Sequence, residues 1–174
     1  MHAIQKYWPT MLLSSIFVFA FLVRIIGLTV TPPAPYWEEV ALGYDAYSIK
    51  ETGKDHHGNF LPLKAVESFG DWKPAGYFYA IIPFLYIFDL GVVAVRMPSV
   101  VAGLLIVLGL YKIARFYSVN PYWAAFVAAI SPWAIHFSRG GWEANMATAA
   151  LLWGVYYGKK GLIDKKMRAP ELIC

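Results

Sequence analysis

Two adjacent carboxylates, Glu38 and Glu39, stand about eight residues beyond an apolar run long enough to cross a membrane. Carboxylates close to a bilayer surface lose hydration energy unless something pairs with them or uses them. Aromatic residues flank the pair, from Trp37 before it to Tyr44 and Tyr47 after it. The pair is therefore the first candidate for chemistry, because an ionised carboxylate can act as a general base.

The segment Glu38 to Thr52 is predicted to form a short amphipathic helix. Val40, Tyr44 and Tyr47 follow the helical spacing of three and four residues, and Gly53 is a stop signal. The two glutamates then occupy the first turn, where the helix dipole favours negative charge. They could therefore be dipole residues without a chemical role, and the sequence alone leaves both interpretations open.

Three cations are candidates to bind a phosphate group. Lys73 opens the segment Lys73-Pro74-Ala75, Arg96 lies near the start of an apolar run, and Arg139 precedes Glu143 between two further runs. Lysine and arginine make charge-assisted hydrogen bonds to phosphate. The alternative for Arg96 and Arg139 is that they only anchor helix ends at the membrane interface.

The composition indicates a membrane protein. Apolar residues make up 59% of the chain and charged residues 15%, whereas soluble domains carry about 25% charge. Met11 to Val30 is long enough for a first span, although Arg24 interrupts it, and Pro32, Pro33 and Pro35 are expected to stop it. A cleaved signal peptide is disfavoured, because the run is too long and the residues after it form a poor cleavage site.

Three further spans are predicted, Val92 to Leu110, Tyr122 to Phe137 and Ala144 to Tyr157. Ala75 to Phe88 is shorter than the usual spanning length of about 17–25 residues, so we expect it to lie flat in the interface. The predicted fold is all-α and integral to the membrane. It has four transmembrane helices, with residues 1–30 as the first span, interfacial helices in an outer loop of residues 31–93, three spans within residues 94–158 and a basic cytoplasmic tail of residues 159–174.

The positions of the basic residues predict which side of the membrane each segment faces. With the N-terminus inside, eight of the 15 basic residues lie in cytoplasmic segments, as the positive-inside rule expects: Lys6, Lys112, Arg115, Lys159, Lys160, Lys165, Lys166 and Arg168. Nine of the 11 acidic residues then lie outside: Glu38, Glu39, Asp45, Glu51, Asp55, Glu67, Asp71, Asp89 and Glu143. The orientation gathers the candidate carboxylates and the three candidate cations on one membrane face. The isoelectric point of 9.1 comes largely from cytoplasmic lysines and does not indicate a nucleic-acid partner.

The order of motifs resembles a known family. The acidic pair is followed by GYDAYSI, TGKDHHGNFLPL, GDWKPAGYFY, VRMPSV and SPWAIHFSRGGWEAN. From Arg24 to Gly158 the chain resembles the N-terminal part of membrane glycosyltransferases that use polyprenyl-phosphate sugar donors. This group includes the protein O-mannosyltransferases and the bacterial aminoarabinose transferases of lipid A, and it has the C-type glycosyltransferase fold.

The resemblance implies roles for single residues. Glu38 matches the catalytic carboxylate, which is usually an aspartate in the family, and Glu39 matches the second acid. Lys73 matches the lysine that contacts the lipid phosphate, and Glu143 matches more loosely an acidic residue on the acceptor side. Arg96 and Arg139 are added as phosphate ligands because of their predicted position. The implied reaction is sugar transfer, with Glu38 as base.

The resemblance also implies the partners and the location. We expect a polyprenyl-phosphate sugar donor, membrane lipids, and a protein, lipid or glycan acceptor, with the active site on the outer face of a bacterial-type plasma membrane. Family members have several times more membrane spans, and the residues after Gly158 do not continue the pattern. We therefore expect this chain to be part of a longer protein.

No cofactor is expected to be required, and a divalent metal is the weaker alternative. His56 and His57 are adjacent, and adjacent residues on an extended chain face opposite ways. No closed zinc-ligand spacing is present in the sequence. A membrane protein that binds a lipid phosphate without chemistry, or an inactive fragment, remains the other class of function. A transporter is disfavoured, because no charged residue lies in the middle of the second, third or fourth predicted span.

Overall fold

The computed structural model describes the backbone of residues 2–168 and the side chains of residues 7–163. In chain order its elements are α1 (His2–Ile25), α2 (Trp37–Thr52), β1 (Ala65–Ser68), β2 (Asp71–Pro74), α3 (Ala75–Phe88), α4 (Val92–Ala114), α5 (Pro121–Ile130), α6 (Pro132–Ser138) and α7 (Glu143–Arg168). The side chains of Lys6, Lys165, Lys166 and Arg168, and the end of the predicted basic tail, lie outside this described part.

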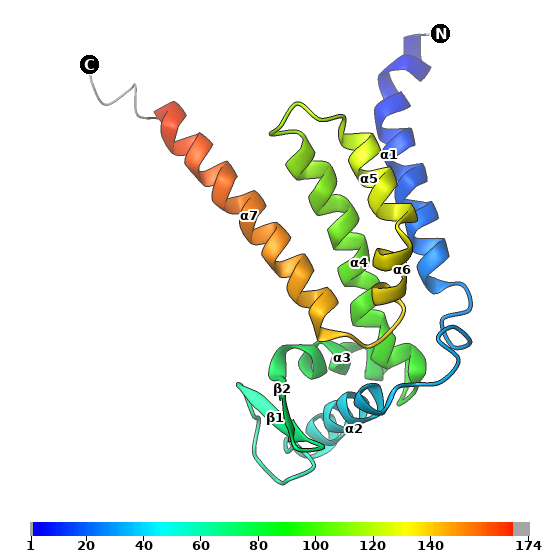
Figure 1. Cartoon of the computed structure of the whole chain (residues 1–174), viewed down its shortest axis with the longest axis vertical. Coiled ribbons are helices and arrows are strands. Elements are labelled where there is room, and N and C mark those ends of the chain that lie inside the picture. Colours follow the sequence, from blue (N-terminus) through cyan, green and yellow to red (C-terminus); the bar gives the residue numbers. More distant parts are fainter. Residues whose placement is uncertain (1, 169–174) are drawn as a thin grey trace.

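The helix α4 lies at the centre of the bundle. It packs against α5 on one side and against α7 on the other, and α1 lies along α5 (Figure 1). The helices α2 and α3 and the β-hairpin gather at one end of the bundle (Figure 1). Within residues 2–168, two helical segments are long and apolar enough to cross a membrane, Tyr7–Ile25 and Val92–Ala114. The prediction of a mainly helical chain is confirmed, whereas the four spans remain a prediction.

The first helix ends earlier than the sequence predicts. It stops at Ile25 instead of Val30, and Gly27 then adopts a left-handed conformation with φ of 66°. Glycine takes that conformation without steric cost, so the chain turns there, and the N–H of Thr31 bonds to the carbonyl of Gly27. The helix therefore ends before it reaches the prolines that were expected to stop it.

The third predicted span is two helices. The chain breaks at Ser131, between α5 and α6, because Pro132 has no N–H to continue the ladder and forces the residue before it into an extended conformation. At 10 residues, α5 has a length of about 15 Å, which is half of the hydrocarbon thickness. The uninterrupted helix predicted over Tyr122 to Phe137 is therefore wrong.

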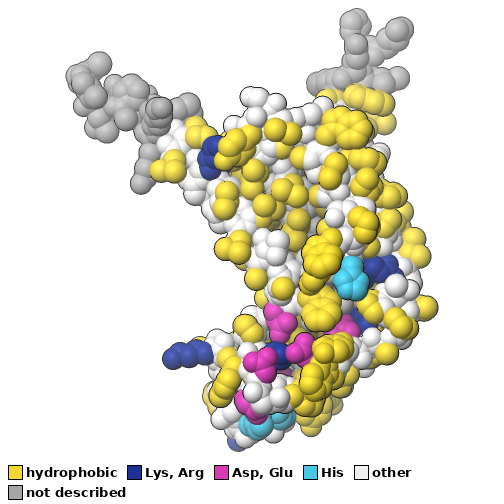
Figure 2. Space-filling model, viewed as in Figure 1, with side chains coloured by type: hydrophobic (Ala, Val, Ile, Leu, Met, Phe, Trp, Pro, Cys, Tyr) yellow, Lys and Arg dark blue, Asp and Glu magenta, His cyan; other side chains and the backbone are white. Residues whose placement is uncertain are grey.

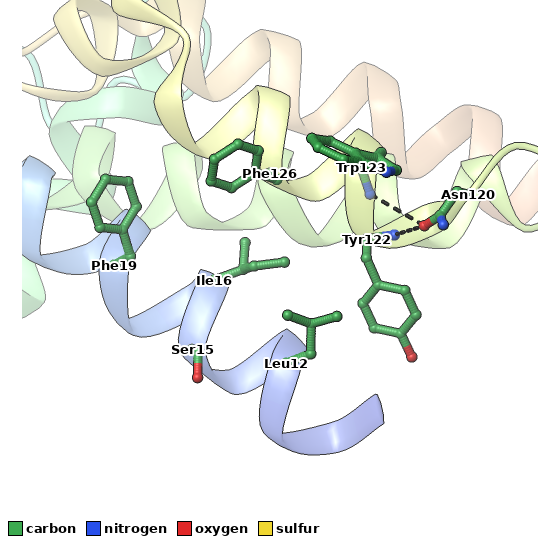
Figure 3. A pocket seen from close by; sticks show the side chains of 8 residues that line it. All are labelled: Leu12, Ser15, Ile16, Phe19, Asn120, Tyr122, Trp123 and Phe126. Carbon is green, nitrogen blue, oxygen red and sulfur yellow. Dashed lines mark hydrogen bonds between the residues drawn. The ribbon is translucent and has the colours of Figure 1, made fainter. Parts of the chain in front are cut away.

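The start of α5 is fixed by a side-chain cap. The Asn120 side-chain oxygen accepts hydrogen bonds from the backbone N–H groups of Tyr122 at 3.0 Å and Trp123 at 3.3 Å (Figure 3). This cap satisfies two of the N–H groups that a helix start leaves unpaired. Beside it lies a groove of about 480 Å³ between α1 and α5, lined on the α1 side by Leu12, Ile16 and Phe19 (Figure 3).

The helix α2 forms as predicted but buries the opposite face. Gly53 ends it in the left-handed conformation. Leu42, Ala46 and Ile49 are buried. The predicted apolar face, made of Val40, Tyr44 and Tyr47, is exposed instead.

The helix α3 has the predicted bounds and supplies the core beneath α2. Tyr77, Phe78 and Ile81 are fully buried there. The hairpin before it was not predicted. Its register pairs Val66 with Lys73, which fixes Lys73 in β2, with only Pro74 between it and α3.

Candidate active site at the α2–α3 end of the bundle

Glu39 and Arg96 form a buried ion pair at the junction of α2 and α4. The Arg96 Nε lies 2.9 Å from Glu39 Oε1 and its Nη2 lies 3.0 Å from Oε2, so the guanidinium grips both oxygens. The backbone N–H of Gly141 donates to the carboxylate at 2.7 Å, and that of Tyr36 donates at 2.9 Å. The arginine is fully buried and the glutamate is 4% exposed. Glu39 thus has four donors and faces inward.

These contacts set the ionisation of Glu39. Burial raises the pKa of its carboxyl, but the hydrogen bonds from Arg96, Tyr36 and Gly141 together outweigh burial, so the pKa lies below its ordinary value. Glu39 is therefore a carboxylate at neutral pH, held as the centre of a junction between α2, α4 and the start of α7.

The remaining donors of Arg96 go to the loop between α1 and α2. The Nη1 donates to the carbonyl of Leu28 at 2.7 Å and to that of Pro32 at 3.0 Å, and the Nη2 donates to the carbonyl of Ala34 at 3.1 Å. A guanidinium has five N–H groups, and here they are directed to Glu39 and the loop. Arg96 therefore fastens onto α4 the loop that leads into α2, where Glu38 and Glu39 lie.

Arg139 makes the corresponding contacts at the end of α1. Its guanidinium donates to the carbonyls of Val23, Ile26 and Gly27, each at 2.8 Å, and to that of Thr31 at 3.1 Å. The last carbonyls of a helix have no partner within the helix, and a cation there also suits the helix dipole. Arg139 thus caps α1, as an anchoring residue would.

Arg24 makes contacts in the opposite direction, from α1 to α5 and α6. It is fully buried and donates to the carbonyls of Ala128 and Ala129 and to the hydroxyl of Ser138. Gly103 of α4 makes room for the pair, because a Cβ at that position would lie 2.1 Å from Ser138 Oγ. Arg24 was noted in the sequence only as an interruption of the first span.

The geometry does not favour the predicted phosphate role of Arg96 and Arg139. Within the described residues, the hydrogen bonds of both guanidinium groups go to Glu39 or to backbone carbonyls. A phosphate would have to displace these partners, which would leave buried carbonyls without donors. The predicted role remains a prediction, and the observed one is to hold the loop after α1.

Glu38 lies one residue from Glu39 and has a different environment. The Lys73 ammonium lies 2.5 Å from Glu38 Oε1 and 2.8 Å from Asp71 Oδ2. These bonds to Asp71 and Glu38 raise the pKa of Lys73 above its ordinary value, so it stays an ammonium ion. An ammonium has three N–H groups, and two are used here. The Glu38 side chain is 27% exposed, so the pair can be reached from solvent.

Glu143 is the third carboxyl at this end of the bundle, at the start of α7. Its Oε1 is buried and finds no hydrogen-bond partner among the described residues. Burial raises the pKa of the Glu143 carboxyl, and the charges of Lys73, Glu38 and Asp71 also act on it. Figure 2 shows acidic and basic side chains gathered beside a concave surface where the bundle meets the hairpin end.

Ser99 ties three helices together behind these residues. Its hydroxyl accepts from the Tyr77 hydroxyl of α3 at 3.1 Å and from the backbone N–H of Trp142 at 3.3 Å. Its carbonyl accepts from the Asn145 side chain of α7 at 2.9 Å. The sequence motifs contain Ser99 and Asn145, but the sequence did not predict their contacts. It also did not predict Asp71 as the second partner of Lys73.

The two histidines do not face opposite ways, so that expectation is wrong. They lie in a turn, with their ring centroids 3.9 Å apart. His56 contacts the Asp45 carboxylate at 2.6 Å, and His57 contacts that of Glu67 at 2.8 Å. Among the described residues there is no group of three His, Cys, Asp or Glu side chains that could hold a metal ion.

The ion pair of Glu39 predicts a pH dependence of stability. The depressed pKa of Glu39 contributes stability that is full above the unfolded value of 4.5 and is lost as the pH falls below it. The Glu39→Gln variant lacks this titration. We expect the difference in melting temperature between the natural chain and the variant, measured in detergent, to shrink as the pH falls below about 4.5. A difference that stays constant from pH 7 to pH 3.5 would contradict this assignment.

Comparison with known families fits this picture. Residues 72–171, more than half of the chain, match the family model described as dolichyl-phosphate-mannose-protein mannosyltransferase. The matched segment contains Lys73, Arg96, Arg139 and Glu143, whereas Glu38 and Glu39 precede it. No curated protein and no solved structure gives a match. The predicted resemblance is confirmed, and the chain belongs to the dolichyl-phosphate-mannose-protein mannosyltransferase family.

Proposed function

We propose that this chain carries part of a site that transfers a sugar from a polyprenyl-phosphate donor to an acceptor on the non-cytoplasmic face of a membrane. The observation that supports the proposal is the contact between Lys73, the cation that we propose binds phosphate, and Glu38, a partly exposed carboxylate. Membership of the family suggests glycosyltransferase activity with such donors. The donor, the acceptor and the base are the parts that we propose.

Lys73 holds the donor phosphate in this proposal. A phosphate oxygen takes the third N–H of the ammonium and competes with Glu38 and Asp71 for the other two. As the donor engages Lys73, Glu38 becomes free to accept a proton. In the structure the proposed base is paired with the cation that is proposed to bind the leaving group.

Glu38 takes the proton of the acceptor in the transfer step. The acceptor oxygen or nitrogen forms a bond to the anomeric carbon, and the bond between that carbon and the phosphate oxygen breaks. The electron pair of the broken bond stays on the phosphate, whose added negative charge Lys73 stabilises. The proton ends on Glu38, so the step needs no oxidant or reductant.

The other predicted residues support this pair. Glu39 and Arg96 fix the start of α2, and Arg139 fixes the loop before it, so they act as positioning residues. Glu143 approaches from α7, and its unpartnered oxygen suits a hydrogen bond from an acceptor hydroxyl. No metal or cofactor has a role in the proposed step.

The charge distribution supports the proposed sidedness. Lys112, Arg115, Lys159 and Lys160 lie at the far end of α4 and on the last described part of α7. With 23 residues, α4 is about 34 Å long, close to the membrane thickness. By the positive-inside rule this basic end is cytoplasmic, which is consistent with Glu38 and Lys73 on the outer face. We propose a bacterial-type plasma membrane as the location. On this proposal α5 with α6, and α7, complete the four spans.

Neutralising Lys73 is expected to weaken donor binding and also to slow transfer, because Lys73 stabilises the leaving phosphate as well. A hydrogen bond to a charged group contributes about 1.5–3 kcal/mol, so Lys73→Gln should raise the KM for the donor about 10- to 100-fold. Lys73→Arg, which keeps the charge, should restore part of the affinity. Steady-state kinetics over a range of donor concentrations measures the effect.

Lys64→Gln is the matched control. Lys64 is exposed just before the same hairpin and makes no ion pair among the described residues. An equal loss of affinity in Lys64→Gln and Lys73→Gln would show that net charge, and not Lys73, binds the donor.

The function itself is tested with a labelled donor. Membranes that contain the chain are incubated with a polyprenyl-phosphate sugar labelled in the sugar, and the label is followed into protein, lipid and glycan fractions. We expect transfer above that of membranes without the chain, and the labelled fraction identifies the acceptor. Donor that binds without losing its label would favour the second candidate, a lipid-phosphate-binding protein without chemistry.

A further inference from the structure

The end of the bundle opposite Glu38 holds a basic pocket that the proposed reaction does not use. It has a volume of about 340 Å³ and lies between the last turn of α4 and the second half of α7. Lys112 and Arg115 line it from α4, and Lys160 lines it from α7. We propose that this pocket binds the phosphate headgroup of an anionic glycerophospholipid.

The three cations have no ionic partner in the described part of the chain. Within the described residues, no ion pair or hydrogen bond is made by the side chains of Lys112, Arg115 or Lys160. The sequence has no Asp or Glu from residue 90 to residue 142. Asp164 follows one turn after Lys160, with its side chain outside the described part, and the C-terminus of α4 adds a partial negative charge. The three positive charges outweigh the charge of Asp164 and the partial charge of the helix end, so the pocket attracts an anion.

Aromatic rings form the wall between the cations. Phe116, in the turn just after α4, stacks on Tyr156 of α7, with ring centroids 5.4 Å apart and an angle of 27°. Lys159 does not line the pocket. Its ammonium lies 3.4 Å from the ring centre of Tyr117 instead. The stack holds the ends of α4 and α7 at a fixed separation, so the cations from the two helices converge on one ligand.

The position of the pocket favours a lipid over a free anion. It lies about 34 Å along α4 from the helix start near Arg96, which is the depth of the opposite headgroup layer if α4 crosses the membrane. Large apolar side chains of α7, Leu151, Val155 and Leu162, are exposed along the helix that forms one wall. Acyl chains can cover such surface while the headgroup meets the cations. Basic pockets between membrane helices bind anionic headgroups in this way.

The test measures lipid retention by the purified chain. The protein is held in detergent micelles doped with phosphatidylglycerol or phosphatidylcholine, and bound lipid is counted by native mass spectrometry. Each basic residue near a charged membrane surface contributes about fivefold in affinity, so three should give about a 100-fold preference for phosphatidylglycerol. The variant Lys112→Gln/Arg115→Gln/Lys160→Gln should lose this preference. The variant Lys112→Arg/Arg115→Lys/Lys160→Arg should keep it.

The control changes the same charge at the other end of the molecule. Lys50→Gln/Lys54→Gln/Lys64→Gln removes three cations near α2 and should leave the preference unchanged. Equal loss in both glutamine variants would overturn the proposal, since net charge alone would then explain binding. Full retention after the pocket cations are removed would also overturn it. Soluble glycerol 3-phosphate is added as a competitor, and displacement of the lipid at equal concentration would assign the pocket to a free phosphate instead.

Discussion

The Glu38→Gln variant is expected to transfer sugar about 10²- to 10⁴-fold more slowly than the natural chain, at unchanged abundance in the membrane. Glutamine keeps the shape of the side chain and its contact with Lys73 but cannot take a proton at neutral pH. The fold does not depend on Glu38, because the side chain is partly exposed and its partner Lys73 also pairs with Asp71. Initial rates with a labelled donor, divided by the amount of protein in the membrane, measure the effect.

Two matched variants control for the loss of charge and for the length of the side chain. Glu51→Gln removes an exposed carboxylate at the other end of α2 and should leave the rate unchanged. Glu38→Asp restores the residue that is usual in the family and should retain activity. A near-normal rate in Glu38→Gln would remove Glu38 from the mechanism.

The Arg96→Met variant is expected to lower the free energy of unfolding by about 3–5 kcal/mol. Methionine fills much of the same space but leaves the Glu39 carboxylate buried without its cation. It also leaves the carbonyls of Leu28, Pro32 and Ala34 without a donor. Chemical unfolding in detergent, followed by circular dichroism, measures the loss.

A double-mutant cycle separates the ion pair from the other contacts. Glu39→Gln/Arg96→Met removes the stranded charge, so the double variant should be more stable than the sum of the two single losses predicts. Arg115→Met is the matched control, since Arg115 is exposed near the end of the same helix. If Arg96→Met and Arg115→Met were equally stable, the ion pair would not hold the loop in place.

Local sequence signals were sufficient to predict the end of α2 and the bounds of α3. Gly53 gives the end of α2 because it alone adopts a left-handed conformation cheaply, and the length of Ala75 to Phe88 gives α3. The break at Ser131 was also readable, because Pro132 cannot continue a helix. The apolar face predicted for α2 lies on its exposed side, since an apolar helical face beside a membrane need not turn toward the protein core.

The sequence could not predict that Glu39 is buried in an ion pair while its neighbour Glu38 is partly exposed. Adjacent helical residues point about 100° apart, so one glutamate turns toward α4 and its neighbour toward the hairpin. Which of them is buried depends on how the loop after α1 folds back onto Arg96, more than 60 residues away. The same holds for Arg139, whose partners are carbonyls at the end of α1 and in the loop after it. The resemblance correctly indicated the family, but only packing separates residues that hold the site from residues that face its opening.

Single-turnover transfer from a labelled polyprenyl-phosphate sugar tests the central claim most directly. The natural chain, Glu38→Gln and Lys73→Gln are each reconstituted in vesicles, and bound donor and transferred label are measured in the same sample. The account predicts that the natural chain binds and transfers, that Glu38→Gln binds donor but transfers little, and that Lys73→Gln binds poorly. Transfer by Glu38→Gln at the natural rate, or donor binding that is indifferent to Lys73, would contradict it.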